Sequence, residues 1–505
     1  MSKRVSNVGD WRNGLPVNVD RDALPVIKEV QHDSREVSEG DLFICIKGMQ
    51  LDGHDFVDQA IANGASVLIV EGTANLDLDK IKIPLIVVEN TRSILADIAA
   101  AHEGYPGKEM TVIGITGTDG KSTTAYLTTA ALEGCGVKVG LLSTIETRIA
   151  GKTVAVPKRL TTQESPVIQK FLRQMANAGC EYVIIEATSH GLSLNRLDNC
   201  FFDIALFTNL SKDHLDFHGT FQNYKLAKSR LFSKLESTHK KSKFPIAILN
   251  RDDENWVYFA DNTNANVITY GVSNVKADIF ANEIVQWSDS STFMLSTDTE
   301  LIEASVPLPG IFNVANATAA LTIGVVLDMD IENLTSALAQ CHEIPGRMEN
   351  IVGAPFEIIV DYAHTPKAMD LVLNTLRSTV EKRIIVVFGC AGERSSDRRK
   401  DLGEVVSRLA DFSFITEEDS RSEDTDTIIA EIAEAMIFQG SVEEQDFVRI
   451  GNREEAINSA LKIANPGDLV LIAGKGHEQS IERSDGVYGW DDRKIVKKKI
   501  SEIFQ

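Results

Sequence analysis

The stretch Gly114-Ile-Thr-Gly-Thr-Asp-Gly-Lys-Ser-Thr-Thr follows an apolar run and precedes Ala125-Tyr-Leu-Thr-Thr-Ala-Ala-Leu, which is in helical register. A glycine-rich turn between a buried strand and a helix lets backbone N–H groups close around phosphate oxygens. We predict that Lys121 supplies positive charge to the β- and γ-phosphates of a nucleotide and that Ser122 or Thr123 reaches Mg²⁺. The alternative is a glycine-rich turn without a ligand.

Outward from this loop, short β-branched runs alternate with helical stretches, which is typical of parallel sheets crossed by helices. The predicted fold class is therefore α/β. The predicted strands are 65–70, 84–88, 111–115, 182–186, 202–207, 356–361, 383–389 and 468–474. The last three end in polar or glycine residues, and in open α/β sheets ligands bind at those carboxyl ends.

A chain of 505 residues is too long for one core, and we expect about three domains. Gly104-Tyr-Pro-Gly-Lys places one boundary near residue 107, and Pro345-Gly-Arg places another near 345. The predicted parts are a small N-terminal α/β domain (1–107), a central P-loop-type ATPase domain (108–345) and a C-terminal Rossmann-like α/β domain (346–505).

The composition, 43% hydrophobic and 25% charged, is that of an ordinary globular protein, and no apolar run is long enough to span a bilayer. The N-terminus lacks the apolar stretch of a secretory signal, so we expect a cytoplasmic protein. A net charge of −22 argues against nonspecific nucleic-acid binding. The six cysteines lack metal-ligand spacing and are expected to be buried, reduced thiols.

Three further residues are candidates for chemistry. Glu186 ends a predicted strand, so its carboxylate should emerge beside the phosphate loop, where a second magnesium ligand belongs; the alternative is a cap on the next helix. His214, within Thr208-Asn-Leu-Ser-Lys-Asp-His, could equally be a core histidine. Lys228 taken alone reads as a solvated surface lysine.

Taken together, and in the order and spacing that they have here, the sequence stretches quoted above resemble those of the Mur ligases, the peptide-adding enzymes of murein synthesis. The resemblance is strongest to the MurE group of that family. The resemblance covers nearly the whole chain. In the first domain, Asp33-Ser-Arg-Glu-Val-Ser-Glu-Gly-Asp and Gly48-Met-Gln-Leu-Asp-Gly-His look like the MurE segments that hold the UDP part of the substrate. The resemblance implies that Ser34, Met49, Gln50 and Leu51 contact the uridine nucleotide.

In the central domain, Gly117-Thr-Asp-Gly-Lys-Ser-Thr is similar to the family's ATP loop, with Asp119 and Ser122 where Asn and Thr are commoner. The residues implied for ATP are Gly117, Thr118, Asp119, Gly120, Lys121, Ser122, Thr123, Asn313, Asn316, Arg347, Asp361 and His364. Those implied for the peptide stem and its carboxylates are Thr161, Thr162, Thr188 and Arg196.

Tyr224-Lys-Leu-Ala-Lys-Ser-Arg matches the family segment whose lysine is carbamylated, and that lysine falls at Lys228. A carbamate is an anion, so it would give magnesium an oxygen ligand where an ammonium would repel the ion. The resemblance implies Mg²⁺ ligands at Ser122, Thr123, Glu186, His214 and carbamylated Lys228. Together with Lys121, the last three of these form the predicted catalytic set.

The third domain carries pieces similar to the MurE pocket for the incoming diamino acid. The implied residues are Arg394, Glu418, Asp419, Ser420, Arg421, Gly474 and Glu478. Enzymes for meso-diaminopimelate usually read Asp-Asn-Pro-Arg where this chain has Glu418-Asp-Ser-Arg. An anion at Asp419 should favour a distal ammonium, so we expect L-lysine or L-ornithine slightly ahead of meso-diaminopimelate.

The implied activity is an ATP-dependent ligase that activates the D-Glu carboxylate of UDP-MurNAc-L-Ala-D-Glu as an acyl phosphate and joins it to the diamino acid. Its partners would be these small molecules, without nucleic acid or membrane insertion, and the protein would be a monomer. Two alternatives stay open. One is a sister ligase, such as a folylpolyglutamate synthase or a pseudomurein peptide ligase; the other is a catalytically silent nucleotide-binding module.

Overall fold

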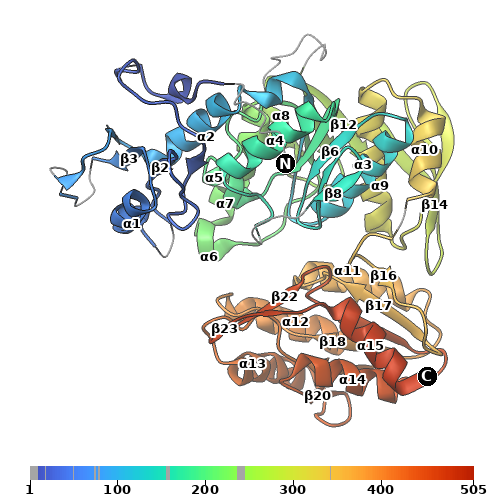
Figure 1. Cartoon of the computed structure of the whole chain (residues 1–505). Coiled ribbons are helices and arrows are strands. Elements are labelled where there is room, and N and C mark those ends of the chain that lie inside the picture. The colour runs from blue at the N-terminus through green and yellow to red at the C-terminus, as the bar shows by residue number, and fades with distance from the viewer. Residues whose placement is uncertain are drawn as a thin grey trace. The chain divides into compact units, whose positions relative to one another are not determined.

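The computed structural model describes residues 9–504 except 18, 49–50, 73–75, 78–79, 155–159, 236–244 and 342. Internal packing divides the chain into two compact units. The first comprises 1–121, 136–213 and 220–268, and the second comprises 122–135, 214–219 and 269–505. Figure 1 labels their helices and strands.

The N-terminal sheet is fully parallel, in the order β1-β2-β3-β4. Its strands are β1 (Val30–Gln31), β2 (Leu42–Ile44), β3 (Val67–Glu71) and β4 (Leu85–Val88). Alternate side chains of these strands pack on opposite faces, against α2 (Thr91–His102) on one and α1 (Val57–Ala62) on the other. Short 3₁₀ helices lie at Trp11–Gly14, Gly53–Phe56 and Pro106–Glu109.

The second sheet has eleven strands in the order β15-β14-β13-β12-β11-β10-β5-β9-β6-β7-β8. They are β5 (Thr111–Thr116), β6 (Val139–Leu142), β7 (Thr147–Ile149), β8 (Lys152–Val154), β9 (Tyr182–Glu186), β10 (Phe202–Phe207), β11 (Ile246–Asn250), β12 (Asn266–Gly271), β13 (Ile279–Gln286), β14 (Ser291–Ser296) and β15 (Leu301–Val306). The strands from β11 through β10, β5 and β9 to β6 are parallel, and both outer hairpins are antiparallel. Strand β5 is therefore central, which places the loop that follows it at the middle of the sheet edge.

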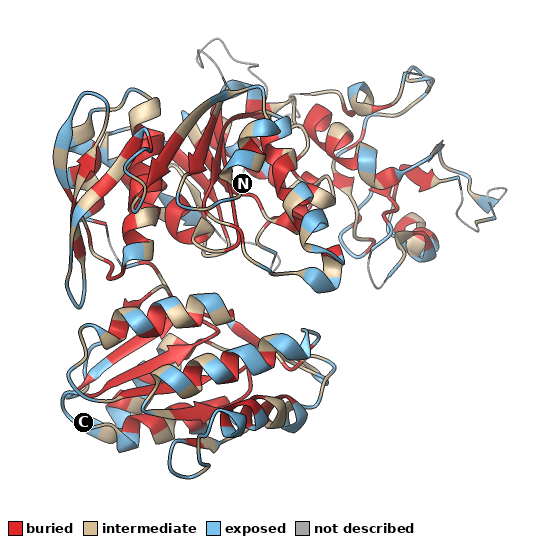
Figure 2. Ribbon diagram, turned by 180° about the vertical axis from the view of Figure 1, so that it is seen from behind, coloured by how far each residue is buried: buried red, intermediate tan, exposed pale blue. Residues whose placement is uncertain are grey.

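Helices cover this sheet and connect its strands. They are α3 (Lys121–Gly134), α4 (Ser165–Asn177), α5 (Ser189–Ser193), α6 (Leu215–His218), α7 (Phe221–Ser233), α8 (Trp256–Asp261), α9 (Ile311–Val326) and α10 (Ile331–Ala339). Side chains of α4, α7 and α8 form one hydrophobic core with β5, β9, β10 and β11. Figure 2 shows the central strands buried and the outward helix faces exposed, as expected for a parallel sheet covered on both faces.

The C-terminal sheet has the order β16-β17-β21-β18-β19-β20, parallel except at β16. The strands are β16 (Glu349–Asn350), β17 (Glu357–Asp361), β18 (Ile384–Phe388), β19 (Phe412–Ile415), β20 (Phe447–Arg449) and β21 (Leu469–Ala473), with a hairpin of β22 (Ser480–Arg483) and β23 (Gly486–Gly489). Helices α14 (Arg453–Ile463) and α15 (Asp492–Phe504) share a core with one face. Helices α11 (Pro366–Arg377), α12 (Ser396–Leu409) and α13 (Thr425–Phe438) pack side by side.

The expected three-domain α/β fold is confirmed, and each of the eight predicted strands is observed within two residues of its expected ends. The antiparallel ladder of β13, β14 and β15 was not predicted, because the alternating burial of these strands gives a weaker apolar signal than a fully buried strand. The domain boundaries near 107 and 345 stay predictions.

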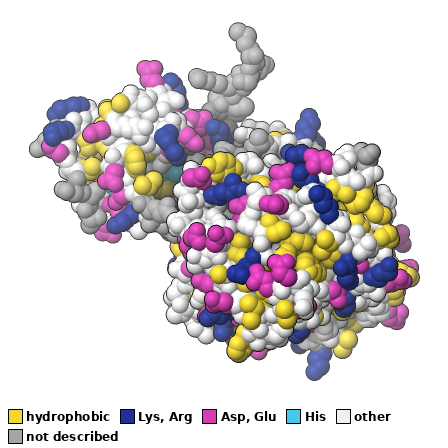
Figure 3. Space-filling model, turned by 90° about the horizontal axis from the view of Figure 1, so that it is seen from below, with side chains coloured by type: hydrophobic (Ala, Val, Ile, Leu, Met, Phe, Trp, Pro, Cys, Tyr) yellow, Lys and Arg dark blue, Asp and Glu magenta, His cyan; other side chains and the backbone are white. Residues whose placement is uncertain are grey.

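Surface features agree with the composition. No helix within the described ranges combines the length and apolar character that a bilayer crossing requires. On the face shown in Figure 3, acidic and basic side chains are interspersed, so that face carries no continuous basic field. All six cysteines are free, and all but Cys135 are buried, as predicted.

One buried carboxyl in the second sheet should make stability depend on pH. Asp203 is fully buried in β10 and accepts a hydrogen bond from the Val112 N–H at 2.9 Å, and burial raises its pKa to about 7. The folded state therefore holds this proton more tightly than the unfolded state, so stability falls as pH rises from about 4 to about 7. The Asp203→Asn variant should gain melting temperature over the parent at pH 8 and gain less at pH 5.

Differential scanning fluorimetry at both pH values tests this expectation. The matched control is Asp298→Asn, since Asp298 lies exposed between β14 and β15, and it should change the melting temperature at neither pH. An Asp203→Asn difference of the same size at pH 5 and pH 8 would contradict the titration of Asp203.

Candidate functional site

The loop after β5 has the backbone of a phosphate-binding turn. Gly117 has φ +152° and Gly120 has φ +83°, values that favour glycine, and α3 begins at Lys121. A Cβ at Gly117 would lie 1.8 Å from Oγ1 of Thr208, so no other residue fits there. The two glycines therefore let the backbone turn sharply into the N-terminus of α3.

The segment after β10 braces the phosphate loop. The Thr118 N–H donates to the Asn209 carbonyl at 2.8 Å, and the Asp119 N–H donates to Asn209 Oδ1 at 3.0 Å. The Thr118 hydroxyl accepts from the Ser211 N–H at 2.9 Å and lies 3.1 Å from the Tyr224 hydroxyl. These bonds hold the loop in place, which suits a preorganised phosphate site.

The cationic and hydroxyl groups of the loop lie where the sequence predicts them. Lys121 Nζ donates to the Thr118 carbonyl at 2.7 Å, so this side chain folds back over its own loop. Ser122 and Thr123 are buried in the first turn of α3. The phosphate loop thus combines a lysine, two hydroxyls and a helix N-terminus, the groups that hold a nucleotide's phosphates.

Lys228 is a buried residue. Its side chain is 1% exposed, its Nζ donates to the Gly117 carbonyl, and it lies 4.6 Å from the centre of the Tyr224 ring. The reading of Lys228 as a surface lysine was wrong, because α7 turns this side chain toward the phosphate loop. Burial lowers its pKa well below that of a free lysine, and the Lys121 charge lowers it further.

Glu186 ends β9 as predicted and is 2% exposed. Its Oε2 accepts hydrogen bonds from the Thr144 N–H at 3.0 Å and the Thr144 hydroxyl at 2.9 Å. The reading of Glu186 as a helix cap was wrong, because the Thr188 hydroxyl caps α5 by accepting from the Gly191 N–H at 3.1 Å. Sequence reasoning missed Thr144, which no motif marks.

His214 lies at the turn before α6, where its φ of 52° is left-handed. It therefore occupies the position that caps a short helix, and its predicted role as a metal ligand stays a prediction.

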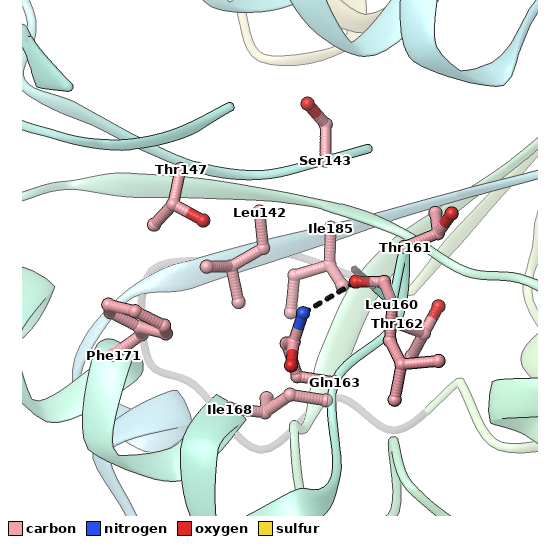
Figure 4. Close-up of a pocket in the computed structure, with 10 residues that line it drawn as sticks. All are labelled: Leu142, Ser143, Thr147, Leu160, Thr161, Thr162, Gln163, Ile168, Phe171 and Ile185. Atoms are coloured by element: carbon pink, nitrogen blue, oxygen red, sulfur yellow. Dashed lines mark hydrogen bonds between the residues drawn. The ribbon is translucent and has the colours of Figure 1, made fainter. Parts of the chain in front are cut away.

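A pocket in the first unit is lined by two residues predicted to bind the peptide stem, Thr161 and Thr162, as Figure 4 shows. Its other lining residues are Leu142, Ser143, Thr147, Leu160, Gln163, Ile168, Phe171 and Ile185. The Thr162 hydroxyl donates to the Glu186 carbonyl at 2.9 Å and accepts from the Thr188 hydroxyl at 2.9 Å. The Thr144 hydroxyl, which donates to Glu186, lies 2.9 Å from the Thr161 hydroxyl and can accept from it, so this pocket adjoins the Glu186 carboxylate.

Arg196, predicted to bind a substrate carboxylate, already has a protein carboxylate as its partner. Its guanidinium lies 2.8 Å from Glu164, which is buried, and also donates to the Thr162 carbonyl at 3.1 Å. Arg92 shares the same carboxylate at 3.2 Å. Sequence reasoning missed Arg92 and the role of Glu164, because this cluster joins segments far apart in the chain.

The residues predicted to contact the uridine nucleotide belong to the segments that follow strands β1 and β2 of the N-terminal sheet. Ser34 is buried, and its hydroxyl donates to Gln59 Oε1 at 2.7 Å. Leu51 is 68% exposed, whereas Met49 and Gln50 lie outside the described residues.

The predicted adenine-side and hinge residues are in the second unit. Asn316 accepts from the Thr124 hydroxyl at 3.2 Å and donates to Asn313 at 3.2 Å, so these amides join α9 to α3. Beyond residue 345, the Arg347 guanidinium lies 4.5 Å from the centre of the Tyr362 ring. Asp361 accepts from the N–H groups of Met348 and Ala363 at 2.7 Å each, and His364 Nδ1 donates to the Tyr362 carbonyl at 2.6 Å.

The predicted amino-acid residues gather where the C-terminal strands end. Asp419 accepts from Lys475 Nζ at 2.8 Å and from the Glu482 N–H at 2.8 Å. Lys475 also pairs with Glu478, which accepts from the Tyr362 hydroxyl at 3.1 Å. The prediction that the Asp419 charge favours a distal ammonium did not include Lys475, which pairs with Asp419 and so weakens that argument.

Arg421 and Ser420 shape the same edge of the sheet. Arg421 has a left-handed φ of 52°, and its guanidinium lies 3.8 Å from Glu393 and 3.8 Å from Glu482. Ser420 is buried, and a Cβ at Gly392 would lie 2.0 Å from the Ser420 carbonyl oxygen. Arg394 follows β18 on the loop that leads to α12. The loop thus keeps a defined shape without the proline found in diaminopimelate enzymes.

Three family descriptions match successive parts of the chain. They are "Mur ligase family, catalytic domain" at residues 26–103, "Mur ligase middle domain" at 115–324 and "Mur ligase, glutamate ligase domain" at 346–476.

Relatives match over almost the full length. A UDP-N-acetylmuramyl-tripeptide synthetase of Roseiflexus sp. is 40% identical, with 95% of each chain covered. A UDP-N-acetylmuramoyl-L-alanyl-D-glutamate–2,6-diaminopimelate ligase of Bacillus velezensis is 38% identical, again over 95% of each. A solved structure of a ligase with the latter name superimposes with a TM-score of 0.65 at 28% identity, covering 99% of this chain and 100% of that one. The chain therefore belongs to the Mur ligase family, in its MurE group, and is an ATP-dependent ligase.

Proposed function

We propose that the protein joins a diamino acid to the D-Glu carboxylate of UDP-MurNAc-L-Ala-D-Glu, a step in making peptidoglycan precursors. The observation that carries this proposal is the phosphate loop with Lys228 buried against Gly117. A ligase that activates a carboxylate with ATP must control the charge at its phosphate site, and a lysine buried beside the phosphate loop can contribute to that control.

The residues present fit ATP and Mg²⁺. A side chain at Gly117 would collide with Thr208, so glycine keeps the tight turn of the phosphate loop, and the α3 N-terminus offers backbone N–H groups. Ser122, Thr123 and Glu186 offer hard oxygens, which Mg²⁺ prefers. Carbamylated Lys228 and His214 complete the proposed ligands. When bound, the metal would offset the negative charge that develops on the transferred phosphoryl group.

Residues of the protein hold the reacting groups of the substrates in position. We assign Lys121 to the transferred phosphate and the Thr161–Thr162 segment to the peptide stem, whose carboxylate takes the phosphoryl group as an acyl phosphate. The amine of the diamino acid then forms the new C–N bond and phosphate leaves. Glu186, fixed by Thr144, keeps its carboxylate directed by two hydrogen bonds.

For the diamino acid, we propose meso-diaminopimelate. Bacillus relatives at 35–38% identity carry 2,6-diaminopimelate in their names, and the names give no support to a lysine preference. Lys475 compensates Asp419, and Arg421 remains for the distal carboxylate. L-Lysine or L-ornithine is the second candidate, favoured by Glu393 and Glu482, which flank Arg421 at 3.8 Å each and compete with a substrate carboxylate.

The test is incubation of the purified protein with ATP, Mg²⁺ and UDP-MurNAc-L-Ala-D-Glu, with meso-diaminopimelate, L-lysine and L-ornithine offered singly and then in competition. We expect a tripeptide product by mass and one phosphate per peptide, with meso-diaminopimelate at least about tenfold ahead in kcat/KM. Product only with lysine or ornithine would select the second candidate.

Absence of product with all three would contradict the proposed function. Folate and a UDP-linked glutamyl peptide serve as control acceptors, because turnover with either would indicate a sister ligase. Cytoplasmic location and the monomeric state stay predictions.

A further inference from the structure

Glu418 is a buried carboxylate that the family resemblance places in the amino-acid pocket, but its part in the chemistry is not defined by that resemblance. It follows β19 and is 7% exposed, and within the described residues its Oε2 has no hydrogen-bond partner. A Cβ built on Gly474, the residue after β21, would lie 2.7 Å from that same oxygen. An acceptor oxygen without a donor in a buried place is unfavourable unless a ligand supplies one.

The position of this oxygen points to the incoming amino acid. β19 and β21 belong to one sheet on either side of β18, and open α/β sheets bind ligands at these carboxyl ends. Gly474 has φ +107° and no side chain, so the Glu418 carboxylate can lie directly against its backbone at this edge of the sheet. Neighbouring Asp419 and Glu478 both pair with Lys475, whereas Glu418 Oε2 has no donor in the part of the chain that the structure describes.

Charged and titratable groups face Glu418 from each element packed around it. They are Tyr362 after β17, Cys390 after β18, Arg398 of α12, Arg453 of α14, and Lys475 and Glu478 after β21. Burial raises the pKa of Glu418 to about 7, although Lys475, Arg398 and Arg453 oppose this rise. A carboxyl with such a pKa gains and loses its proton readily near neutral pH.

We propose that Glu418 binds the reacting ammonium of the incoming amino acid and accepts its proton as the amine attacks. The inference rests on the proposed function and deepens it. The ammonium gives one proton to the Glu418 carboxylate and becomes a neutral amine. Its lone pair forms the C–N bond to the acyl-phosphate carbon, and the C–O bond to phosphate breaks. Phosphate leaves with that bond's electrons and takes up the second proton, which the nitrogen loses in becoming an amide. Glu418 releases its proton to solvent before the next turnover.

The experiment compares the full-length protein with Glu418→Gln and Glu418→Asp. Each receives ATP, Mg²⁺ and UDP-MurNAc-L-Ala-D-Glu with either the diamino acid or hydroxylamine. Hydroxylamine is largely unprotonated at neutral pH, so it captures an acyl phosphate as a hydroxamate without a base. For Glu418→Gln we expect peptide formation about a hundredfold slower, with hydroxamate formation within about threefold of the parent.

Two further readouts separate a chemical role from a structural one. The peptide rate of Glu418→Gln should keep rising with pH toward the range of the free amine, whereas the parent should level off near neutral pH. Glu418→Asp should recover part of the rate, because it restores the carboxylate one methylene shorter.

The outcomes are distinguishable. Peptide formation by Glu418→Gln within about threefold of the parent, or equal loss of peptide and hydroxamate, would overturn the role of Glu418. A parent enzyme that gives neither peptide nor hydroxamate would overturn the proposed function and this inference with it.

Discussion

Replacing Lys228 with alanine should lower the rate of peptide formation about a thousandfold and leave the fold intact. The side chain is buried against the Gly117 carbonyl and the Tyr224 ring, so its loss removes a group from the base of the phosphate loop. Rate loss of this size is typical when an enzyme loses one charged group that stabilises a developing anion. The measurement is phosphate release coupled to peptide mass.

The chemistry of Lys228 is tested by rescue. Burial and the nearby Lys121 charge lower its pKa, and this favours the neutral amine, which is the form that reacts with CO₂. If the working form is a carbamate, formate or acetate should restore a measurable part of the activity to Lys228→Ala. Uptake of ¹³CO₂ by the parent, seen as a carbamate signal by NMR, should be absent in the variant.

The matched control is Lys225→Ala on the same helix. Lys225 Nζ donates to Asn255 Oδ1 at 2.8 Å and lies over the Tyr258 ring, away from the phosphate loop. This variant should retain activity within about threefold and should not respond to added carboxylates. Equal activity of Lys228→Ala and the parent would remove Lys228 from the catalytic set.

The phosphate loop was predictable because its chemistry is local. A strand, glycines at two positions with positive φ, a lysine and a helix start lie within a dozen consecutive residues. Glu186 was predictable for a related reason, since the end of a buried strand marks the functional edge of a parallel sheet. In both cases, the position of a residue relative to the end of its own strand predicts where its side chain lies.

Long-range pairing was not predictable from the residues alone. The sequence places Asp419 in a pocket but cannot reveal that Lys475, 56 positions away, neutralises it. Arg92 and Arg196 likewise share Glu164, although Arg92 lies 72 positions and Arg196 lies 32 positions from Glu164 in the chain. Burial of Lys228 depends on which face of α7 meets the sheet. Only the family resemblance pointed to it, because a lone lysine on a helix is usually solvated.

The largest stability effect is expected at Arg453 and Asp492, both 0% exposed. Arg453 makes a two-pronged ion pair with Asp492 at 2.9 and 2.7 Å, and it donates to the Ala473 carbonyl at 2.7 Å. Asp492 also accepts from the Trp490 indole N–H at 2.8 Å. Arg453→Met would leave Asp492 buried without its cation, so the free energy of unfolding should fall by about 3–5 kcal/mol.

The measurement is the denaturant midpoint of the parent and variants. Arg449→Met is the control, since its ion pair with Glu443 is partly exposed and its loss should cost about 1 kcal/mol or less. A double variant, Arg453→Met with Asp492→Asn, should regain part of the stability, because it no longer buries an unpaired charge. Equal midpoints for Arg453→Met and Arg449→Met would contradict the argument.

The same pair also bears on the amino-acid site. Arg453 donates to the carbonyl of Ala473 and, at 3.3 Å, to that of Glu417, the residues just before Gly474 and Glu418. It thus fixes the ends of β21 and the segment after β19 relative to one another. Below its melting temperature, Arg453→Met should therefore raise the KM for the diamino acid more than the KM for ATP. A matched rise in both constants would indicate general loosening instead of a defect at this edge of the sheet.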